Sequence, residues 1–184
     1  MQKGIKFRIY PNKGQKAFIH QTLGCCRFIY NRGLAMRKEG YEKGEKIGYG
    51  QTSAMLTELK KQEEFAFLKE VDSIALQQSL RDLDRGFVNF FQKRASHPTF
   101  KSKHNHFQSY RTVNQKDNIR IVGRYIKLPK LGYVKVRQSM EVGNIRHVTI
   151  EHTPSGKYFA VLNIDFEPEP RPNAGGTIGI DVGI

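Results

Sequence analysis

The chain has 184 residues and a net charge of +14, because 31 Lys and Arg residues outnumber 17 Asp and Glu residues. Such a balance favours nucleic acid or another anionic surface as a partner. No apolar run approaches the roughly 20 residues of a membrane span, so we expect no membrane contact. The adjacent Cys25 and Cys26 suit neither a metal knuckle nor an ordinary disulfide, which is consistent with a cytoplasmic protein.

The positive charge falls in two blocks. Residues 1–46 carry a net charge of +8 and residues 85–140 carry +12, whereas residues 47–84 and 141–184 carry −3 each. Cations bind phosphates, and the aromatic rings interleaved with them can stack on bases. The block over 85–140 therefore favours a nucleic-acid surface over a merely solvated one.

The predicted elements begin with a strand over residues 3–10, whose apolar side chains alternate with a basic outer face. Helical periodicity follows over 13–38, where Asn12 can cap the first turn, and over 51–61. Glycines punctuate a polar loop between these two helices. The order so far is strand, helix, loop and helix.

The third helix has the clearest apolar stripe, from Leu76 to Phe90, and either Asp72 or Ser73 can cap its start. After Pro98 the helical period is lost. We expect an irregular loop there, in which basic and aromatic residues alternate.

Strands return over residues 119–137, with turns at 123–124 and 131–132. Residues 145–153 and 157–166 predict a hairpin around Pro154 and Gly156. The prolines from Pro168 to Pro172 lack amide donors and cannot continue a sheet, so residues 167–176 read as a linker.

The last residues place one acid, Asp181, at the centre of a short β-branched strand between Gly179 and Gly183. An acid on an apolar strand is unfavourable unless it binds something, such as a divalent metal or a phosphate group. Either use needs partners from later chain. We therefore expect this sequence to be the front part of a larger nucleic-acid enzyme.

Six motifs, in this order and spacing, resemble those of the TnpB family. TnpB proteins are encoded by insertion sequences and are RNA-guided DNA endonucleases related to type V CRISPR effectors. The resemblance covers essentially the whole chain. The motifs are IKFRIYP at 5–11, RFIYN at 27–31, LQQSL at 76–80 followed by FF at 90–91, PTFKSK at 98–103, IKLPKLG at 126–132 and GIDVG at 179–183.

The resemblance implies an α+β fold in four parts. Residues 1–12 and 96–166 would form a wedge-type β-barrel, and residues 13–95 an inserted helical recognition lobe. After the linker, residues 177–184 would begin a RuvC nuclease domain of the RNase H-like fold. The implied partners are a structured guide RNA from the transposon end and a double-stranded DNA target, in which base pairing reads the sequence and the protein reads a short adjacent motif.

The resemblance also implies a catalytic role for Asp181, as the first of three carboxylates that hold Mg²⁺ for phosphodiester cleavage. One aspartate cannot hold a metal pair alone, and the family's later acids and paired CxxC zinc ligands are absent from these residues. We therefore expect no stable metal binding and no nuclease activity from this fragment.

The resemblance also implies which residues contact the short DNA motif, because they stand at the positions that make this contact in the family. They are Tyr49, Ser53 and Gln77, with Thr112 as a weaker candidate, and Gln77 could pair with adenine N6 and N7. Ser73 stands where the family has a basic contact, which is a departure. Ordinary surface and packing roles explain these side chains equally well.

Phosphate contacts without base preference are expected from six cations: Lys101, Lys103, Arg111, Arg120, Arg124 and Lys127. His97, His104 and His106 invite a metal interpretation, but their spacing matches no helical or finger pattern. We interpret them as polar loop residues.

Three alternatives stay open. The GIDVG motif also resembles the first phosphate loop of actin-like ATPases and sugar kinases. The helix pair within 51–93 could form a helix-turn-helix, although the long loop around residues 60–72 fits that motif poorly. The strongest alternative is a non-enzymatic guided binder of DNA or RNA that acts as a regulator, or a decayed relic of a transposase.

Overall fold

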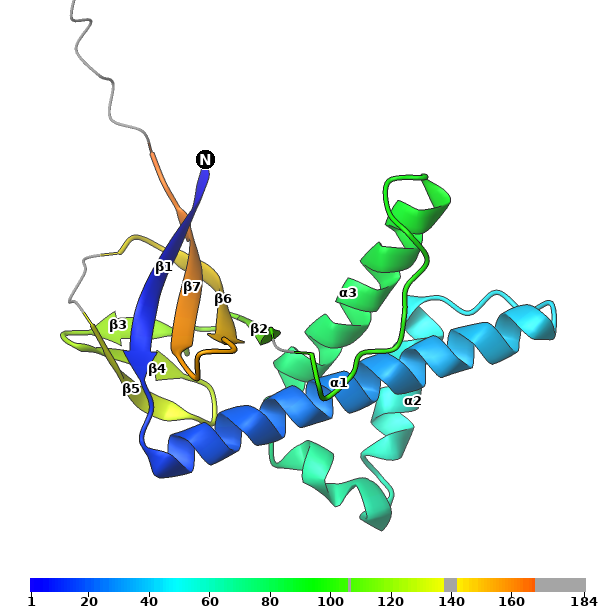
Figure 1. Cartoon of the computed structure of the whole chain (residues 1–184), viewed down its shortest axis with the longest axis horizontal. Coiled ribbons are helices and arrows are strands. Elements are labelled where there is room, and N and C mark those ends of the chain that lie inside the picture. Colours follow the sequence, from blue (N-terminus) through cyan, green and yellow to red (C-terminus); the bar gives the residue numbers. More distant parts are fainter. Residues whose placement is uncertain (106, 138–141, 168–184) are drawn as a thin grey trace, which may run out of the picture.

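The computed structural model describes residues 1–105, 107–137 and 142–167. Figure 1 shows the strands gathered at one end and the helices at the other, with α1 passing along both. The mixed α+β composition predicted from the sequence is therefore confirmed. The elements are β1 (Gln2–Tyr10), α1 (Lys13–Glu42), α2 (Tyr49–Leu59), the 3-10 helix η1 (Glu63–Lys69), α3 (Ser73–Phe91), β2 (Gln108–Val113), β3 (Arg120–Val122), β4 (Tyr125–Leu128), β5 (Gly132–Val136), β6 (Ile145–His152) and β7 (Tyr158–Asp165).

Helix α1 starts at a capping box. The side chain of Asn12 accepts a hydrogen bond from the backbone N–H of Gln15, and the Gln15 side chain accepts one from the N–H of Asn12. The predicted cap is thus confirmed, but the predicted end at residue 38 is wrong. Gly40 lies inside the helix and is buried, the helix ends at Glu42, and Gly44 then turns the chain with a φ of +76° that suits glycine.

Helix α3 begins at Ser73 and is capped by Asp72, because the Asp72 carboxylate accepts a hydrogen bond from the N–H of Ile74 at 2.9 Å. Its apolar stripe packs against α1, as the predicted helix–helix core requires. The expected loop between residues 60 and 72 is partly wrong, since η1 occupies most of it and buries Leu68.

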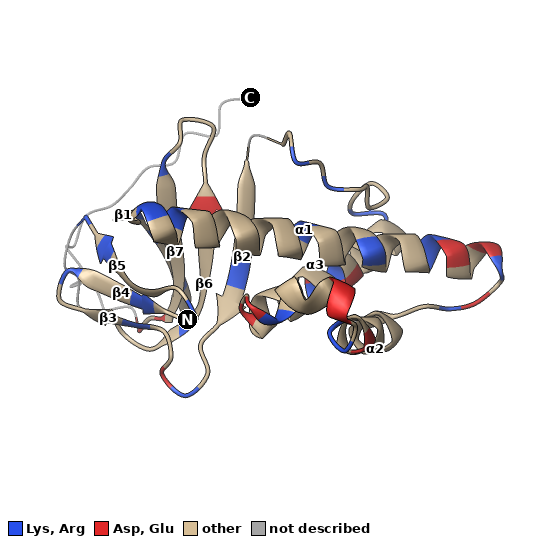
Figure 2. Cartoon of the chain, turned by 90° about the horizontal axis from the view of Figure 1, so that it is seen from below, with Lys and Arg blue, Asp and Glu red and all other residues tan. Residues whose placement is uncertain are grey.

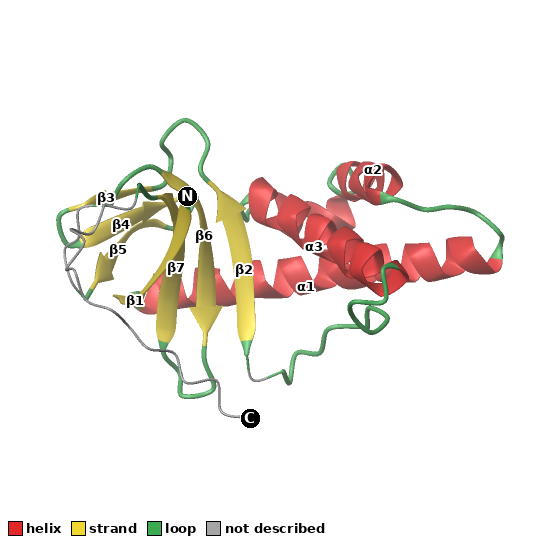
Figure 3. Ribbon diagram, turned by 90° about the horizontal axis from the view of Figure 1, so that it is seen from above, coloured by secondary structure: helices red, strands yellow, loops and turns green. Residues whose placement is uncertain are grey.

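The seven strands form one antiparallel sheet in the order β2-β6-β7-β1-β5-β4-β3. Its inner face joins α1 and α3 in a common core, to which Ile9, Ile19 and Leu76 all belong. In Figure 3, α1 crosses behind β1, β7, β6 and β2. The strands on both sides of the helices in sequence therefore meet in one sheet.

The irregular loop expected after Pro98 is wrong for its last part. Residues 108–113 form β2, an edge strand on β6, because Tyr110 and Thr112 point into the core with 7% and 2% exposure. Only two inward positions, one of them a threonine, mark this strand. That is too short an alternation to stand out among the surrounding basic and aromatic residues.

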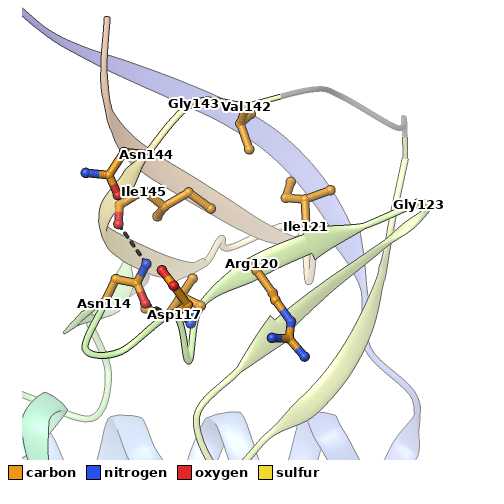
Figure 4. Close-up of a pocket in the computed structure, with 10 residues that line it drawn as sticks. Asn114, Asp117, Arg120, Ile121, Gly123, Val142, Gly143, Asn144 and Ile145 are labelled. Carbon is orange, nitrogen blue, oxygen red and sulfur yellow. Dashed lines mark hydrogen bonds between the residues drawn. The ribbon is translucent and has the colours of Figure 1, made fainter.

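The sheet is open, so the closed barrel is not seen among the described strands. Strands β2 and β3 are its two edges, and β3 has only three residues to offer a partner. A pocket of about 860 Å³ lies between β3 and the start of β6. Figure 4 shows it, with Asn114 donating to the carbonyl oxygen of Ile145 at 2.8 Å on one side and Ile121 on the other.

Candidate nucleic-acid interface

The outer face of β1, β5, β4 and β3 carries tyrosines and cations in alternation. Apolar residues of these strands, such as Val134 and Ile126, point inward and are fully buried. Period-2 alternation therefore turns their neighbours outward. We call the outward set the tyrosine–cation face, and its residues are Tyr10, Arg120, Tyr125, Lys127, Tyr133 and Lys135.

The strand register sets these side chains in two rows. In the first row Lys135 stands between Tyr10 on β1 and Tyr125 on β4. In the second, Lys127 stands between Tyr133 on β5 and Arg120 on β3. Directly opposed residues have Cβ atoms about 4.5–5.5 Å apart, so each lysine lies beside two neighbours that can share one ligand.

The electrostatics of the face favour an anion. Residues 118–137 contain six Lys and Arg residues and no acid, and Figure 2 shows blue segments on β3, β4 and β5. A hydrogen bond from Arg120 to the Tyr133 hydroxyl, with the nearby charges of Arg120 and Lys127, lowers the pKa of Tyr133. The tyrosines expose between 43% and 49% of their surface, which leaves ring area free for stacking.

Of the six cations predicted to contact phosphates, Arg120 and Lys127 lie on this face and Arg124 lies in the turn that joins β3 to β4. Arg111 is instead paired with Asp82 of α3 in a half-buried ion pair that ties β2 to α3. Because Asp82 neutralises most of its charge, Arg111 has less charge available for a phosphate than the exposed cations have.

Lys101 and Lys103 lie on the loop that follows α3, away from the sheet face. Asn31 of α1 binds the backbone of Lys101 twice, accepting from its N–H at 2.8 Å and donating to its carbonyl oxygen at 3.0 Å. The Lys101 ammonium lies 4.2 Å from the Tyr30 ring centroid, and its partial burial lowers the pKa of Lys101. Lys103 is exposed.

Three of the residues predicted to contact the DNA motif, Tyr49, Ser53 and Gln77, lie on α2 and α3, which pack against each other. The Arg81 guanidinium stacks 4.8 Å from the Tyr49 ring centroid, and the Lys60 ammonium donates to the Ser73 hydroxyl at 2.9 Å. Residues 53 and 77 fall between these two contacts on their respective helices. We call Tyr49, Ser53, Lys60, Gln77 and Arg81 the two-helix face.

Sequence reasoning missed Lys60 and Arg81 in this group. Arg81 follows Gln77 by four residues, which places both on one side of α3, so the helical period could have found it. Lys60 comes from the other helix, and no local pattern connects it to Ser73. Gln77 is exposed, whereas Tyr49 and Ser53 are half-buried.

Thr112 differs from the other predicted contacts because its side chain is buried. Its hydroxyl donates to the Asp72 carboxylate, whose other oxygen caps α3. In this conformation Thr112 supports the start of α3 and thereby the position of Gln77, one turn further along.

The three histidines interpreted as polar loop residues give a mixed picture. His97 packs edge-on against Phe87 and Phe90, with ring centroids 5.3 and 5.1 Å away, so it belongs to an aromatic cluster. His104 is exposed, and His106 lies outside the described residues. Within the described residues no three His, Cys, Asp or Glu side chains come close enough together to hold a metal ion.

The predictions for residues 168–184 also lie outside the described residues, and these include the linker, the first RuvC strand and Asp181.

Both cysteines are buried, and burial raises the pKa of Cys26 to about 12. None of the helices in the described ranges is both long and apolar enough to cross a membrane.

Comparison with known proteins points to one family. A family model described as a helix-turn-helix domain, of the OrfB/IS605 type, matches residues 1–46. In the structure these residues form β1 and α1, a strand and a single helix, and not two helices joined by a turn.

Three curated proteins are similar to the chain. It is 35% identical over 188 aligned residues to "Putative RNA-guided DNA endonuclease InsQ" of Escherichia coli K12, covering 99% of this chain and 45% of that protein. A Streptomyces pristinaespiralis protein described in the same way, but without the name InsQ, is also 35% identical and is covered to 46%. A virulence protein of Salmonella dublin, VsdF, is 33% identical over 114 residues, which are 56% of this chain and 96% of that protein. The chain thus spans about half the length of the two endonuclease-named relatives.

Proposed function

Because the chain belongs to the TnpB family of insertion-sequence proteins, we propose that it is the nucleic-acid-binding part of a transposon-encoded RNA-guided DNA endonuclease. The observation that carries the proposal is the tyrosine–cation face. Its alternating rings and cations suit a polyanion with accessible bases better than they suit a protein or a small metabolite.

The tyrosine–cation face binds a structured guide RNA in this proposal. Lys127, Lys135 and Arg120 contact phosphates, and the tyrosines stack on bases in loops or bulges, where RNA exposes its ring faces. Arg124 extends the same surface at the β3–β4 turn. Lys101 and Lys103 contact backbone phosphates from the loop that follows α3. Arg111 contributes indirectly, because its ion pair with Asp82 holds β2 against α3.

The two-helix face reads a short motif of the DNA duplex. Gln77 supplies the amide that can pair with adenine, and Tyr49 and Ser53 line its surroundings. Lys60 lies against Ser73 and so supplies a cation at the position where the resemblance expects one. Thr112 contributes by fixing the start of α3.

Cleavage belongs to the longer family members in this proposal. Their RuvC domain would start at residues 177–184, with Asp181 as a Mg²⁺ ligand. The open sheet with its pocket corresponds to the wedge-type barrel, and residues 13–95 to the recognition lobe. A role of this chain as a guided binder without cleavage is the second candidate, because both proposed faces are complete within residues 10–135.

The proposal is tested by binding and selection. The 184-residue chain should bind RNA transcribed from the end of its own insertion sequence more tightly than an unrelated structured RNA of equal length. With that RNA bound, it should enrich one short motif from a randomised DNA duplex.

Two variants locate the activities. Gln77→Ala should change the enriched motif and leave RNA affinity intact, while Lys127→Gln with Lys135→Gln should weaken RNA binding. Equal affinity for both RNAs would refute the guide-RNA role. Mg²⁺-dependent cleavage of a matched duplex by the pure chain would overturn the assignment of cleavage to longer members.

A further inference from the structure

The ends of α1 and α3 lie at the far end of the helical part, away from the sheet (Figure 1), and they carry a second group of aromatic side chains. The end of α1, the turn before α2 and the end of α3 enclose a groove of about 820 Å³, a volume typical of ligand sites. We call it the distal groove and define it by Tyr41, Ile47, Phe87, Phe90, Phe91 and His97.

The floor of the groove is aromatic. Phe91 lies 5.4 Å from Phe90 and 6.3 Å from Phe87 between ring centroids, and the rings of Phe91 and Phe87 are stacked. His97 closes the group edge-on against Phe87. Phe87 is 9% exposed and anchors the cluster, whereas Phe91 is 74% exposed and Tyr41 is 83% exposed. Large apolar groups exposed together mark interaction sites more often than isolated ones do.

The charges around the groove select among possible occupants. Arg37 and Lys38 line it from α1 and Lys46 from the turn, and Arg37 is held by Asp84 and by the Phe87 ring at 4.6 Å. Glu42 and Glu45 also line it. Lys93 and Arg94 follow directly after α3 and are exposed. Residues 92–104 also contain Lys101 and Lys103 and no acid, so the segment that follows α3 is cationic.

Flat rings with free faces beside cations fit a nucleobase joined to its phosphate. Bases stack on aromatic side chains regardless of sequence, but only when they are not already stacked inside a duplex. A second copy of the chain fits less well, because a two-fold contact at the groove would bring the cationic segment that follows α3 close to its own copy.

We propose that the distal groove binds an unpaired nucleotide, with its base stacked on Phe91 and Tyr41 and its phosphate near Lys93, Arg94 and Lys46. This inference rests on the proposed function for the nature of the ligand, and it adds a site separate from the tyrosine–cation face and the two-helix face. The site would hold a strand that leaves a paired region.

The test uses the full chain with fluorescein-labelled dT12 and rU12 oligonucleotides and a duplex of equal length. The variant Phe91→Ala with Tyr41→Ala should weaken binding of the single strands by roughly 5- to 160-fold, the loss expected for one stacked base. Its salt dependence should stay unchanged, because no charge is removed. Val88→Ala is the matched control, since Val88 is 46% exposed on the same helix and does not line the groove.

A second readout uses fluorescence. The chain has no tryptophan, so Phe91→Trp introduces a single reporter, and the single strands should quench it strongly. Val88→Trp should respond weakly. Three results would each overturn the inference. The first is a single-strand affinity of the double alanine variant within twofold of that of the unmodified chain, and the second is equal quenching of Trp at both positions. The third is a double alanine variant that converts a dimer of the chain to a monomer without loss of single-strand binding.

These outcomes separate this inference from the proposed function. If the tyrosine–cation face variants weaken binding and the groove variants do not, only the distal groove assignment fails. If the unmodified chain binds neither RNA nor single strands, both fail.

Discussion

Removing three cations from the tyrosine–cation face should flatten the salt dependence of RNA binding. The variant replaces Arg120, Lys127 and Lys135 by Gln. These side chains stand on three adjacent strands, where the cross-strand register places Lys127 and Lys135 beside tyrosines and Arg120 beside Lys127, so all three can contact phosphates of one ligand.

The magnitude follows from counterion release. Each phosphate contact contributes about −0.7 to −0.9 to the slope of log affinity against log salt. Three lost contacts should therefore reduce the slope by about 2.1–2.7. Between 50 and 200 mM NaCl the unmodified chain should then lose roughly 20- to 40-fold more affinity than the variant does.

The assay is fluorescence anisotropy with labelled transposon-end RNA at five salt concentrations. The matched control replaces Lys13, Lys16 and Lys157 by Gln, because these cations are exposed but lie outside the face. Both variants should unfold in urea within about 1.5 kcal/mol of the parent, since surface substitutions usually change stability by less than about 0.5 kcal/mol each. An unchanged slope, or an equal reduction in the control, would refute the face as the phosphate-binding surface.

Three further predictions concern the framework. Thr112→Val should destabilise the fold by roughly 1–3 kcal/mol in urea unfolding, because it leaves a buried oxygen of Asp72 without its partner; Thr112→Ser keeps the hydroxyl and should cost less. Cys26 is buried and should react with thiol reagents at pH 8 only as fast as the chain unfolds. Because folding raises the pKa of Cys26 from 9.0 to about 12, its contribution to stability is full below pH 9 and is lost as the pH rises toward 12. Burial and then the neighbouring His20 lower the pKa of His152, so its contribution is present above pH 6.5 and is lost as the pH falls; His152→Gln should flatten the decline of stability below pH 6.5.

The fold was predictable where the pattern is local. Alternation marked β1, the strands around Gly123 and Gly132 and the β6–β7 hairpin, and the helical period marked α1, α2 and α3. The pattern failed where tertiary packing overrides it. Gly40 stays inside α1, and β2 became visible only through the two side chains it buries.

The candidate site divides in the same way. The charge count and the interleaved aromatics predicted a nucleic-acid surface and named Arg120, Arg124 and Lys127. They did not predict that Lys135 and Tyr10 join Lys127 and Arg120 on one face, because residues 10 and 135 meet only through strand pairing.

The sequence by itself determined the sign of the charge, the identity of most elements and the family, since these depend on residue types and on short-range periods. Tertiary structure decided which cations are available. Arg111 is held by Asp82, and Lys60 lies against Ser73. An ion pair or a shared face depends on the distance between side chains from separate elements, and only the packing of strands and helices fixes that distance.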